Sequence, residues 1–140
     1  MFTDISNVAE VAIYVDDLPR AITFYTSVLS LPISAQYPDA CFLQTGPDST
    51  IILFDRKALA ERQSPIPHHG ATGPTHIALA VPIYQMDAWR DRLKSLNITI
   101  EHEQKWPQGT LSIYFRDPDN NSIELIDGRH YGYIWDTIGA

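Results

Sequence analysis

The sequence is poor in cysteine and in basic residues, and it has no long apolar run. Cys41 is the single cysteine among 140 residues, so an intrachain disulfide and a zinc site built on paired cysteines are excluded. Cys41 stands in an apolar stretch, and we expect its thiol to pack as a small hydrophobic group.

The charge balance is acidic, because 17 Asp and Glu residues outnumber 10 Lys and Arg residues and give a formal net charge of −7. Without a basic run, binding of nucleic acid or an anionic membrane through bulk charge is not expected. The N-terminal residues lack the basic and apolar regions of a secretory signal, and no apolar stretch approaches the ~20 residues that cross a bilayer. We therefore expect a cytoplasmic protein with no membrane or nucleic-acid partner.

The main feature of the sequence is an internal repeat. Residues 10–15 (EVAIYV) correspond to residues 76–81 (HIALAV), and residues 49–55 (STIILFD) correspond to residues 121–127 (NSIELID). Each half predicts a strand, a helix and three further strands. The expected strands are 11–15, 33–36, 40–44 and 51–54 in the first half, and 75–81, 98–102, 111–116 and 123–126 in the second.

A helix is expected after the first strand of each half. In the first half, residues 16–17 offer an N-cap, and apolar residues continue at helical spacing to Leu29. In the second half the apolar stripe spans Met86–Leu96. Between the halves we expect a short helix at 56–63 and an irregular, proline-rich linker at 64–70.

Strand alternation places three polar side chains on the sheet faces that point away from the helices. Glu10, His76 and Glu124 alternate with large apolar residues that should face the helix of their own half. Each half is too small to bury both faces of its sheet, so we expect the two sheets to meet around a shared cleft. Two buried carboxylates and one imidazole are then explained by a divalent cation among them.

Plainer interpretations of the same three residues stay open at this point. Glu10 could be solvated at the start of its strand, and His76 could be a hydrogen-bonded core histidine. Glu124 could pair with Arg116 or Arg129. Alternation alone does not choose between these roles and a metal site.

Three segments carry a family resemblance: residues 11–25, residues 73–81, and residues 112–125 with their run YFRDPD…IEL. They resemble the vicinal oxygen chelate superfamily, which includes glyoxalases, bleomycin-resistance proteins and extradiol dioxygenases. The resemblance implies a single α+β domain in which two βαβββ modules form a cup-shaped mixed sheet, and it implies a homodimer. The modules would span about 5–56 and 74–127, with a linker at 57–73 and a C-terminal tail at 128–140.

The resemblance also implies a metal site at the first and last strands of the modules. His76 and Glu124 match two ligand positions, and Glu10 falls where many members have His or Gln. Ile52 falls at a fourth position, where glyoxalase I enzymes supply a carboxylate. We therefore expect one divalent ion per chain (Mn, Fe, Ni, Zn or Mg) held by Glu10, His76 and Glu124, with both glutamates catalytic.

Candidate substrate contacts are Tyr114, Arg116, Trp106 and Phe54. Tyr114 and Arg116 share a strand face with Ser112, and fosfomycin-resistance members of the family use Tyr, Lys and Arg near the phosphonate. Trp106 and Phe54 could line an aromatic wall, although core packing suits Phe54 better. Four histidines could supply a base or an extra ligand: His68, His69, His102 and His130. His102 could instead face the helix. The aromatic residues of the tail, Tyr131, Tyr133 and Trp135, could cover a sheet edge or form a dimer contact.

The predicted function is that of a divalent-metal enzyme acting on a small substrate with vicinal oxygens. Dioxygenase, lyase, isomerase and thiol-transferase chemistry all remain open, because the ligand set departs from both the glyoxalase I and the dioxygenase pattern. The alternative is a metal-free protein that sequesters a small molecule or antibiotic, as bleomycin-resistance members do. A purely structural module with an unused cleft is a third hypothesis, which the polar residues on the small-residue face argue against.

Overall fold

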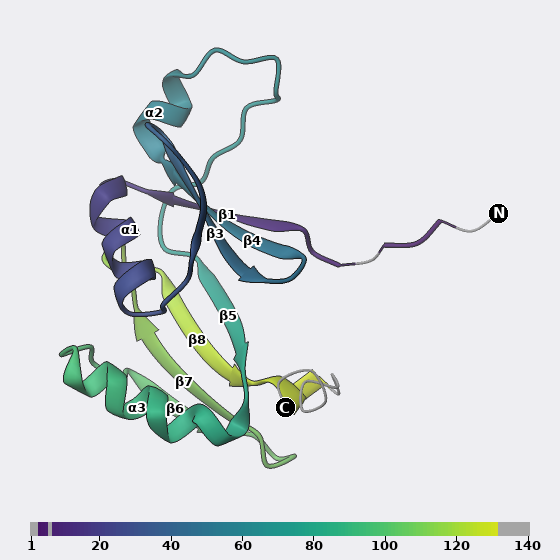
Figure 1. Cartoon of the computed structure of the whole chain (residues 1–140), viewed down its shortest axis with the longest axis vertical. Helices are drawn as coiled ribbons and strands as arrows, with labels where there is room; N and C mark the ends of the chain where they lie inside the picture. Colours follow the sequence, from purple (N-terminus) through teal and green to yellow (C-terminus); the bar gives the residue numbers. More distant parts are fainter. Residues whose placement is uncertain (1–2, 6, 132–140) are drawn as a thin grey trace. The chain divides into compact units, whose positions relative to one another are not determined.

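The computed structural model describes residues 3–5 and 7–131. The chain forms two compact units, Met1–Gly73 and Pro74–Ala140, and each contains a four-stranded mixed sheet (Figure 1). This confirms the predicted α+β class built from two βαβββ repeats. Tyr133 and Trp135 of the aromatic tail lie outside the described residues. Among the helices of the described part, none has the length and apolar character that a membrane span requires.

The first unit has the strand order β1-β4-β3-β2. β1 runs parallel to β4, and β3 is antiparallel to β4 and β2. The elements of this unit are β1 (Glu10–Val15), α1 (Leu18–Ser27), β2 (Ile33–Tyr37), β3 (Ala40–Gly46), β4 (Ser49–Asp55) and α2 (Arg56–Glu61). Each strand and helix expected in this half is therefore present, and the short helix ends at Glu61.

One face of the first sheet is covered by α1. The helix begins at its predicted cap, where Asp17 Oδ1 accepts a hydrogen bond from Arg20 N at 3.1 Å. α1 packs against β3 and β4 and buries Ala21 and Tyr25 completely. The alternate strand residues on this face are at most 1% exposed: Ile13, Val15, Cys41, Leu43, Ile51 and Leu53.

The opposite face of the first sheet carries a second apolar cluster. It contains Ala40, Ile52, Phe54 and, from α2, Leu59. Asp55 at the end of β4 caps α2, because its Oδ1 accepts from Ala58 N at 2.9 Å. The chain therefore turns back at the end of β4, and α2 covers part of this face.

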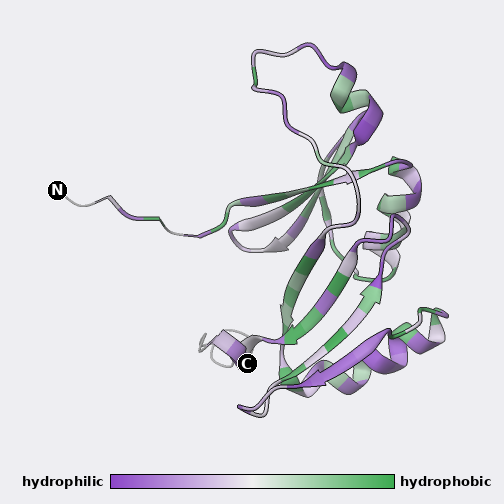
Figure 2. Ribbon diagram, turned by 180° about the vertical axis from the view of Figure 1, so that it is seen from behind, coloured by the Kyte–Doolittle hydropathy of each residue, from purple (hydrophilic) through white to green (hydrophobic). Residues whose placement is uncertain are grey.

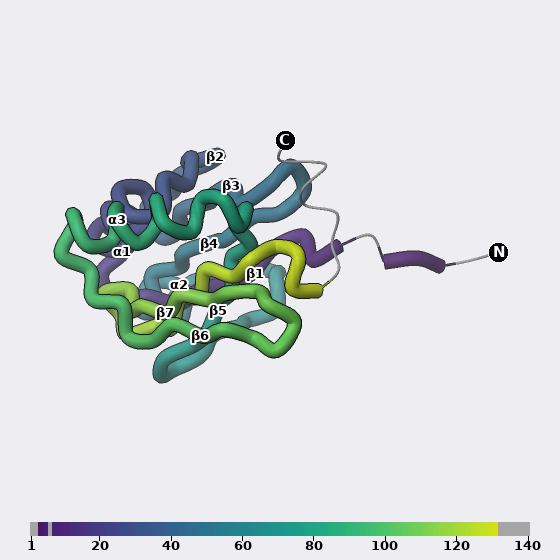
Figure 3. The backbone as a smooth tube through the Cα atoms, turned by 90° about the horizontal axis from the view of Figure 1, so that it is seen from below, coloured from purple at the N-terminus to yellow at the C-terminus, as the bar shows by residue number. Residues whose placement is uncertain are grey.

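The second unit repeats the topology with the order β5-β8-β7-β6, in which β5 is parallel to β8. In Figures 1 and 3, α3 lies along one side of this sheet. The edge strand β6 (HEQK) is hydrophilic throughout (Figure 2), which suits a strand with one unpaired edge. The elements are β5 (His76–Val81), η1 (Ile83–Gln85), α3 (Met86–Ser95), β6 (His102–Lys105), β7 (Leu111–Arg116), β8 (Ser122–Asp127) and the single turn η2 (Gly128–Tyr131).

One predicted strand in the second half is misplaced. The apolar stripe of the expected helix ends at Leu96, which is the C-cap of α3, but the strand expected at 98–102 begins only at His102. The cause is a Schellman turn, in which Asn97 has φ +58° and Ile98 N donates to Leu93 O at 2.8 Å. This turn redirects the backbone, and pairing with β7 begins where Glu101 N donates to Tyr114 O at 2.7 Å, immediately before β6.

Candidate functional site

A histidine–glutamate pair lies on the face of the second sheet opposite to that of Ile123 and Leu125. His76 opens β5, and Glu124 lies in the middle of β8, where its register partner is Ala78. His76 Nε2 is 3.1 Å from Glu124 Oε1. The side chain of Glu124 is 8% exposed and that of His76 49%. The fold of this unit thus brings two of the three predicted metal ligands together.

The second ring nitrogen of His76 is held by the neighbouring strand. His76 Nδ1 lies 3.1 Å from both the carbonyl oxygen and the hydroxyl of Ser122. A hydrogen on Nδ1 donated to the carbonyl leaves Nε2 as the atom that faces Glu124. Ser122 therefore fixes the plane of the imidazole, with Nε2 directed at Glu124.

Glu124 is also hydrogen-bonded through its other oxygen. The hydroxyl of Ser112, on β7, donates to Glu124 Oε2 at 2.6 Å. Trp106 Nε1 in turn donates to Ser112 Oγ at 2.9 Å. The sequence had signalled Trp106 only as an aromatic wall residue and Ser112 only as a member of this strand face, so their link to Glu124 was missed.

The alternative pairing of Glu124 with an arginine is wrong. Arg116 forms a two-pronged ion pair with Glu101, at 2.8 and 3.1 Å. Arg129 pairs with Asp127 at 2.7 Å. The role of Arg116 as a substrate contact stays a prediction. To bind an anion, Arg116 would have to break its ion pair with Glu101 or keep only part of it.

Tyr114 lies directly opposite Glu124 across β7 and β8. Its ring stacks on His76 at 6.2 Å between centroids, and the ring of His102 lies 5.8 Å away on the other side. Burial, followed by the negative charge of Glu124, raises the pKa of the Tyr114 hydroxyl. That hydroxyl therefore stays protonated at neutral pH and remains a hydrogen-bond donor.

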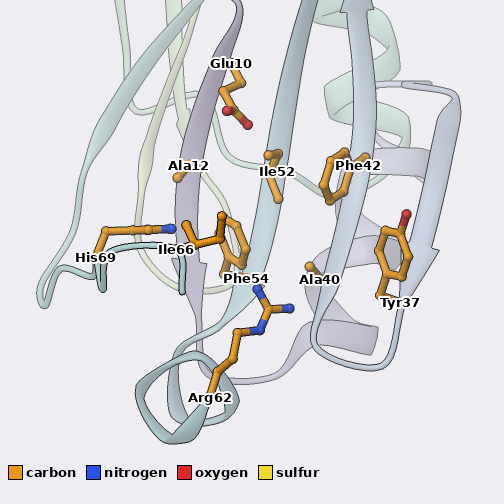
Figure 4. Close-up of a pocket in the computed structure, with 10 residues that line it drawn as sticks. All are labelled: Glu10, Ala12, Tyr37, Ala40, Phe42, Ile52, Phe54, Arg62, Ile66 and His69. Carbon is orange, nitrogen blue, oxygen red and sulfur yellow. The ribbon is translucent and has the colours of Figure 1, made fainter. Parts of the chain in front are cut away.

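Glu10, the third predicted ligand, belongs to the first unit and is exposed at the start of β1. It lines a pocket of about 560 Å³ together with Ile52 and Phe54 (Figure 4). In the close-up the Glu10 carboxylate points toward Ile52. The rest of the wall is formed by Ala12, Tyr37, Ala40, Phe42, Arg62, Ile66 and His69. Phe54 is 7% exposed and belongs to the apolar cluster, as expected.

His69 of the pocket wall is paired with Tyr14, a contact that the sequence did not predict. The hydroxyl of Tyr14 lies 2.7 Å from His69 Nδ1, across 55 residues of sequence. Both rings contact Phe54, at centroid distances of 6.0 Å for Tyr14 and 5.1 Å for His69. Strand alternation in residues 10–15 places Tyr14 on the same face as Glu10, but nothing in the sequence distinguishes His69 from its neighbour His68.

The other histidines have local partners. His102 Nε2 lies 3.0 Å from Gln104 Oε1, and the His102 ring lies beside Tyr114 rather than toward α3. His130 Nδ1 lies 2.7 Å from Thr110 Oγ1, and the His130 ring is 5.1 Å from that of Trp106. Among residues 3–5 and 7–131, no group of three His, Cys, Asp or Glu side chains is positioned to hold a metal ion.

The amino-acid sequence matches a known protein family. The sequence model of the Glyoxalase/Bleomycin resistance protein/Dioxygenase superfamily matches residues 7–125. The chain belongs to this superfamily. Its members commonly use a divalent metal, bind small-molecule substrates and are often dimers. The predicted family resemblance is thereby confirmed.

Three similar proteins illustrate the comparison. The crystal structure of lactoylglutathione lyase from Agrobacterium tumefaciens is 34% identical, with a TM-score of 0.87, and the match covers 94% of this chain and 100% of that one. Glutathione transferase FosA from Serratia marcescens is 28% identical over 90% of this chain and 81% of its own. The fosfomycin resistance protein FosX from Listeria monocytogenes shares the fold, with a TM-score of 0.64 and 23% identity over 94% of this chain and 98% of its own.

The two repeats of this superfamily member differ at the site. Glu10 is the first residue of β1 and His76 is the first residue of β5. Each of these strands runs parallel to the last strand of its unit, β4 or β8. Ile52 lies opposite Ala12, as Glu124 lies opposite Ala78. An apolar side chain thus stands in the first unit where the second has its buried carboxylate.

Proposed function

We propose that the protein is a divalent-metal-dependent enzyme that acts on a small substrate with neighbouring oxygen atoms. The observation that carries this proposal is the buried Glu124 carboxylate, whose Oε1 faces His76 Nε2 at 3.1 Å. An imidazole nitrogen and a carboxylate oxygen are both common ligands of first-row divalent metal ions.

The donor set fits a first-row divalent ion. His76 Nε2 and Glu124 Oε1 supply one nitrogen and one oxygen, and we propose Glu10 of the first unit as the third ligand. Nitrogen and carboxylate donors suit Mn, Fe, Ni or Zn, and the oxygen-rich set also admits Mg. When bound, such an ion would supply Lewis-acid polarisation of a substrate oxygen.

The chain's own groups would bind and orient the substrate. The protonated Tyr114 hydroxyl, next to Glu124, can donate to an oxygen atom held at the site. We propose Trp106 and Phe54 as apolar wall residues and Arg116 as an anion contact. The Serratia and Agrobacterium relatives are a glutathione transferase and a lactoylglutathione lyase. We therefore propose thiol-dependent lyase or transferase chemistry as the first reaction class to assay.

Elemental analysis of the purified protein tests this proposal. We expect about one Mn, Fe, Ni or Zn per chain, removed by dialysis against a chelator and restored by adding that metal. His76→Ala should fail to regain the metal. His102→Ala is the matched control, because His102 lies on the same sheet but is bonded to Gln104. If the wild-type protein binds no metal after reconstitution, or if His76→Ala retains it, the proposal is wrong.

A metal-free binding protein is the second candidate, and the pocket of the first unit favours it. Its wall is largely aromatic and aliphatic, Glu10 supplies an acidic group, and the charge of Arg62 in the wall is paired with Asp39. Such a pocket suits an organic cation with a flat apolar body. Under this hypothesis, cationic aromatic compounds bind with the same affinity before and after chelator treatment, and no turnover is found.

A further inference from the structure

We propose that Trp106 and Ser112 are positioning residues that hold Glu124 for its ligand, a role that rests on the proposed function. The pair takes up one carboxylate oxygen, Oε2, and leaves the other, Oε1, directed at His76 Nε2. Glu124 would thus bind a metal through one chosen oxygen in one orientation.

The direction of each hydrogen bond follows from the chemistry of the groups. An indole nitrogen can only donate, so Ser112 Oγ must accept the hydrogen of Trp106 Nε1 over 2.9 Å. The single hydroxyl hydrogen of Ser112 is then free to point elsewhere, and Glu124 Oε2 accepts it at 2.6 Å. Trp106 thereby orients a hydroxyl that would otherwise rotate, and the Ser112 hydroxyl is not available to a substrate.

Burial makes this arrangement specific. Ser112 is 1% exposed and Glu124 is 6% exposed. Water therefore cannot readily replace the serine, and Oε2 without it would be a buried acceptor with no partner. Outer hydrogen bonds of this kind orient metal-binding carboxylates and hold their charge.

The indole itself is fixed by the β6–β7 turn. Trp106 N donates to Thr110 O at 2.9 Å, and Gly109 N donates to Trp106 O at 2.9 Å. Gly109 has φ +92°, a conformation that a residue with a Cβ rarely adopts. The indole ring also packs against the ring of His130, with 5.1 Å between their centroids. The tight turn folds Trp106 back over its own hairpin, which brings Nε1 to Ser112.

The first repeat supplies an internal control for this inference. At the position equivalent to Glu124 it has Ile52, and at the position equivalent to Ser112 it has Ala40, since Ala40 pairs with Phe54 as Ser112 pairs with Ile126. Both residues are apolar and belong to one cluster. Where the carboxylate is absent, the hydroxyl is absent too, so the serine is not a requirement of the fold.

Zn²⁺ titration of the chelator-treated full chain tests the proposal. Ser112→Ala should weaken Zn²⁺ binding about 10–100-fold, as loss of an outer partner does. Ser112→Thr, which keeps the hydroxyl, should restore most of the affinity. Trp106→Phe, which keeps a ring against His130 but loses the N–H, should weaken binding about 2–10-fold. Trp89→Phe on α3 is the matched control and should bind as the wild type does.

The double variant separates positioning from general packing. If Trp106 acts through Ser112, then Trp106→Phe costs no further affinity in the Ser112→Ala background. Additive losses, or unchanged affinity in both single variants, would overturn the proposal. Urea midpoints of every variant show whether a loss of affinity merely follows a loss of folding.

A readout without metal keeps this inference distinct from the proposed function. In the metal-free protein, the indole N–H signal of Trp106, assigned by its loss in Trp106→Phe, should shift and exchange faster with solvent in Ser112→Ala. An unshifted signal would overturn the positioning role. If the signal shifts but the wild type binds no Zn²⁺, Mn²⁺ or Ni²⁺, the proposed metal function fails while the hydrogen-bonded orientation of Glu124 stands.

Discussion

Ile52 and Glu124 occupy the same register position in the two repeats. Ile52 lies opposite Ala12 in the first sheet, and Glu124 lies opposite Ala78 in the second. Ile52 is 4% exposed among apolar side chains. Glu124 is 6% exposed and bonded on both of its oxygens. The repeats share one backbone plan, but only the second provides the partners that a buried carboxylate needs.

Ile52→Glu should therefore destabilise the protein. The new carboxylate would replace an apolar side chain of the cluster at the pocket wall, and its partial loss of hydration should cost about 1–3 kcal/mol. Urea unfolding measures the change. Ile52→Leu, which conserves volume, should cost less than about 1.5 kcal/mol. Equal stability of the two variants would show that the first sheet accommodates a carboxylate.

Glu124→Gln should remove metal binding while the fold persists. Glutamine matches the size of glutamate and can still accept from Ser112, but it lacks the negative charge. Metal affinity should fall by more than the ~10–100-fold that is typical when a residue that only hydrogen-bonds to a metal ligand is lost. Calorimetric titration with Zn²⁺ checks this. Glu101 is an exposed carboxylate paired with Arg116, so the control variant Glu101→Gln should bind Zn²⁺ as the wild type does. Unchanged affinity in Glu124→Gln would remove this residue from the ligand set.

Tyr14→Phe should release His69 from the wall of the first pocket. The variant keeps the ring contact with Phe54 and loses only the hydroxyl that lies 2.7 Å from His69 Nδ1. The free energy of unfolding should fall by about 0.5–1.5 kcal/mol, and protease cleavage within residues 62–73 should become faster. Tyr37→Phe removes a hydroxyl from another part of the same pocket wall and serves as the control. A cleavage rate that does not change would show that the pair does not hold this segment.

Arg129→Met should weaken the protein in a pH-dependent way. Burial opposes ionisation of Asp127, but the hydrogen bonds and charge of Arg129 outweigh it and lower the pKa of that carboxyl. A lowered folded-state pKa stabilises the protein above the unfolded value, near 4, and this contribution is lost as the pH falls through the folded pKa. We expect a loss of about 1 kcal/mol at pH 7.

Urea midpoints of wild type and Arg129→Met at pH 7, 5, 4 and 3 check this dependence. The difference should be largest at pH 7 and should shrink below pH 4, because a neutral carboxyl gains little from the guanidinium. Arg20→Met on α1 is the control for the loss of one positive charge. A difference that stays constant from pH 7 to pH 3 would contradict the assignment to Asp127.

Cys41 should be inert to thiol reagents in the native protein. Its side chain is fully buried in β3, and burial raises the pKa of the thiol. The thiolate is the reactive form, so both accessibility and ionisation oppose the reaction. Spectrophotometric titration with a disulfide reagent should show no fast reaction in buffer and one equivalent in denaturant. A fast equivalent in buffer would mean that β3 opens readily.

Much of each unit could be predicted from local pattern. Alternation of apolar residues identified every strand of the first unit, and the cap at Asp17 marked the start of α1, because these features depend on neighbours along the chain. The strand expected at 98–102 was misplaced because the Schellman turn at Asn97 decides where pairing can begin. Apolar residues at Ile98 and Ile100 resemble a strand whether or not a partner strand lies beside them.

The sequence by itself determined the repeat, the fold class and the sheet face on which His76 and Glu124 lie, since strand periodicity depends only on the order of apolar and polar residues along the chain. The tertiary structure decided which groups those residues contact. Ser112 bonds to Glu124, Arg116 pairs with Glu101, and His69 reaches Tyr14 across the chain. Partners of this kind depend on turns, such as the one that folds Trp106 onto its own hairpin, and on a few ångströms of separation, which composition and spacing do not encode.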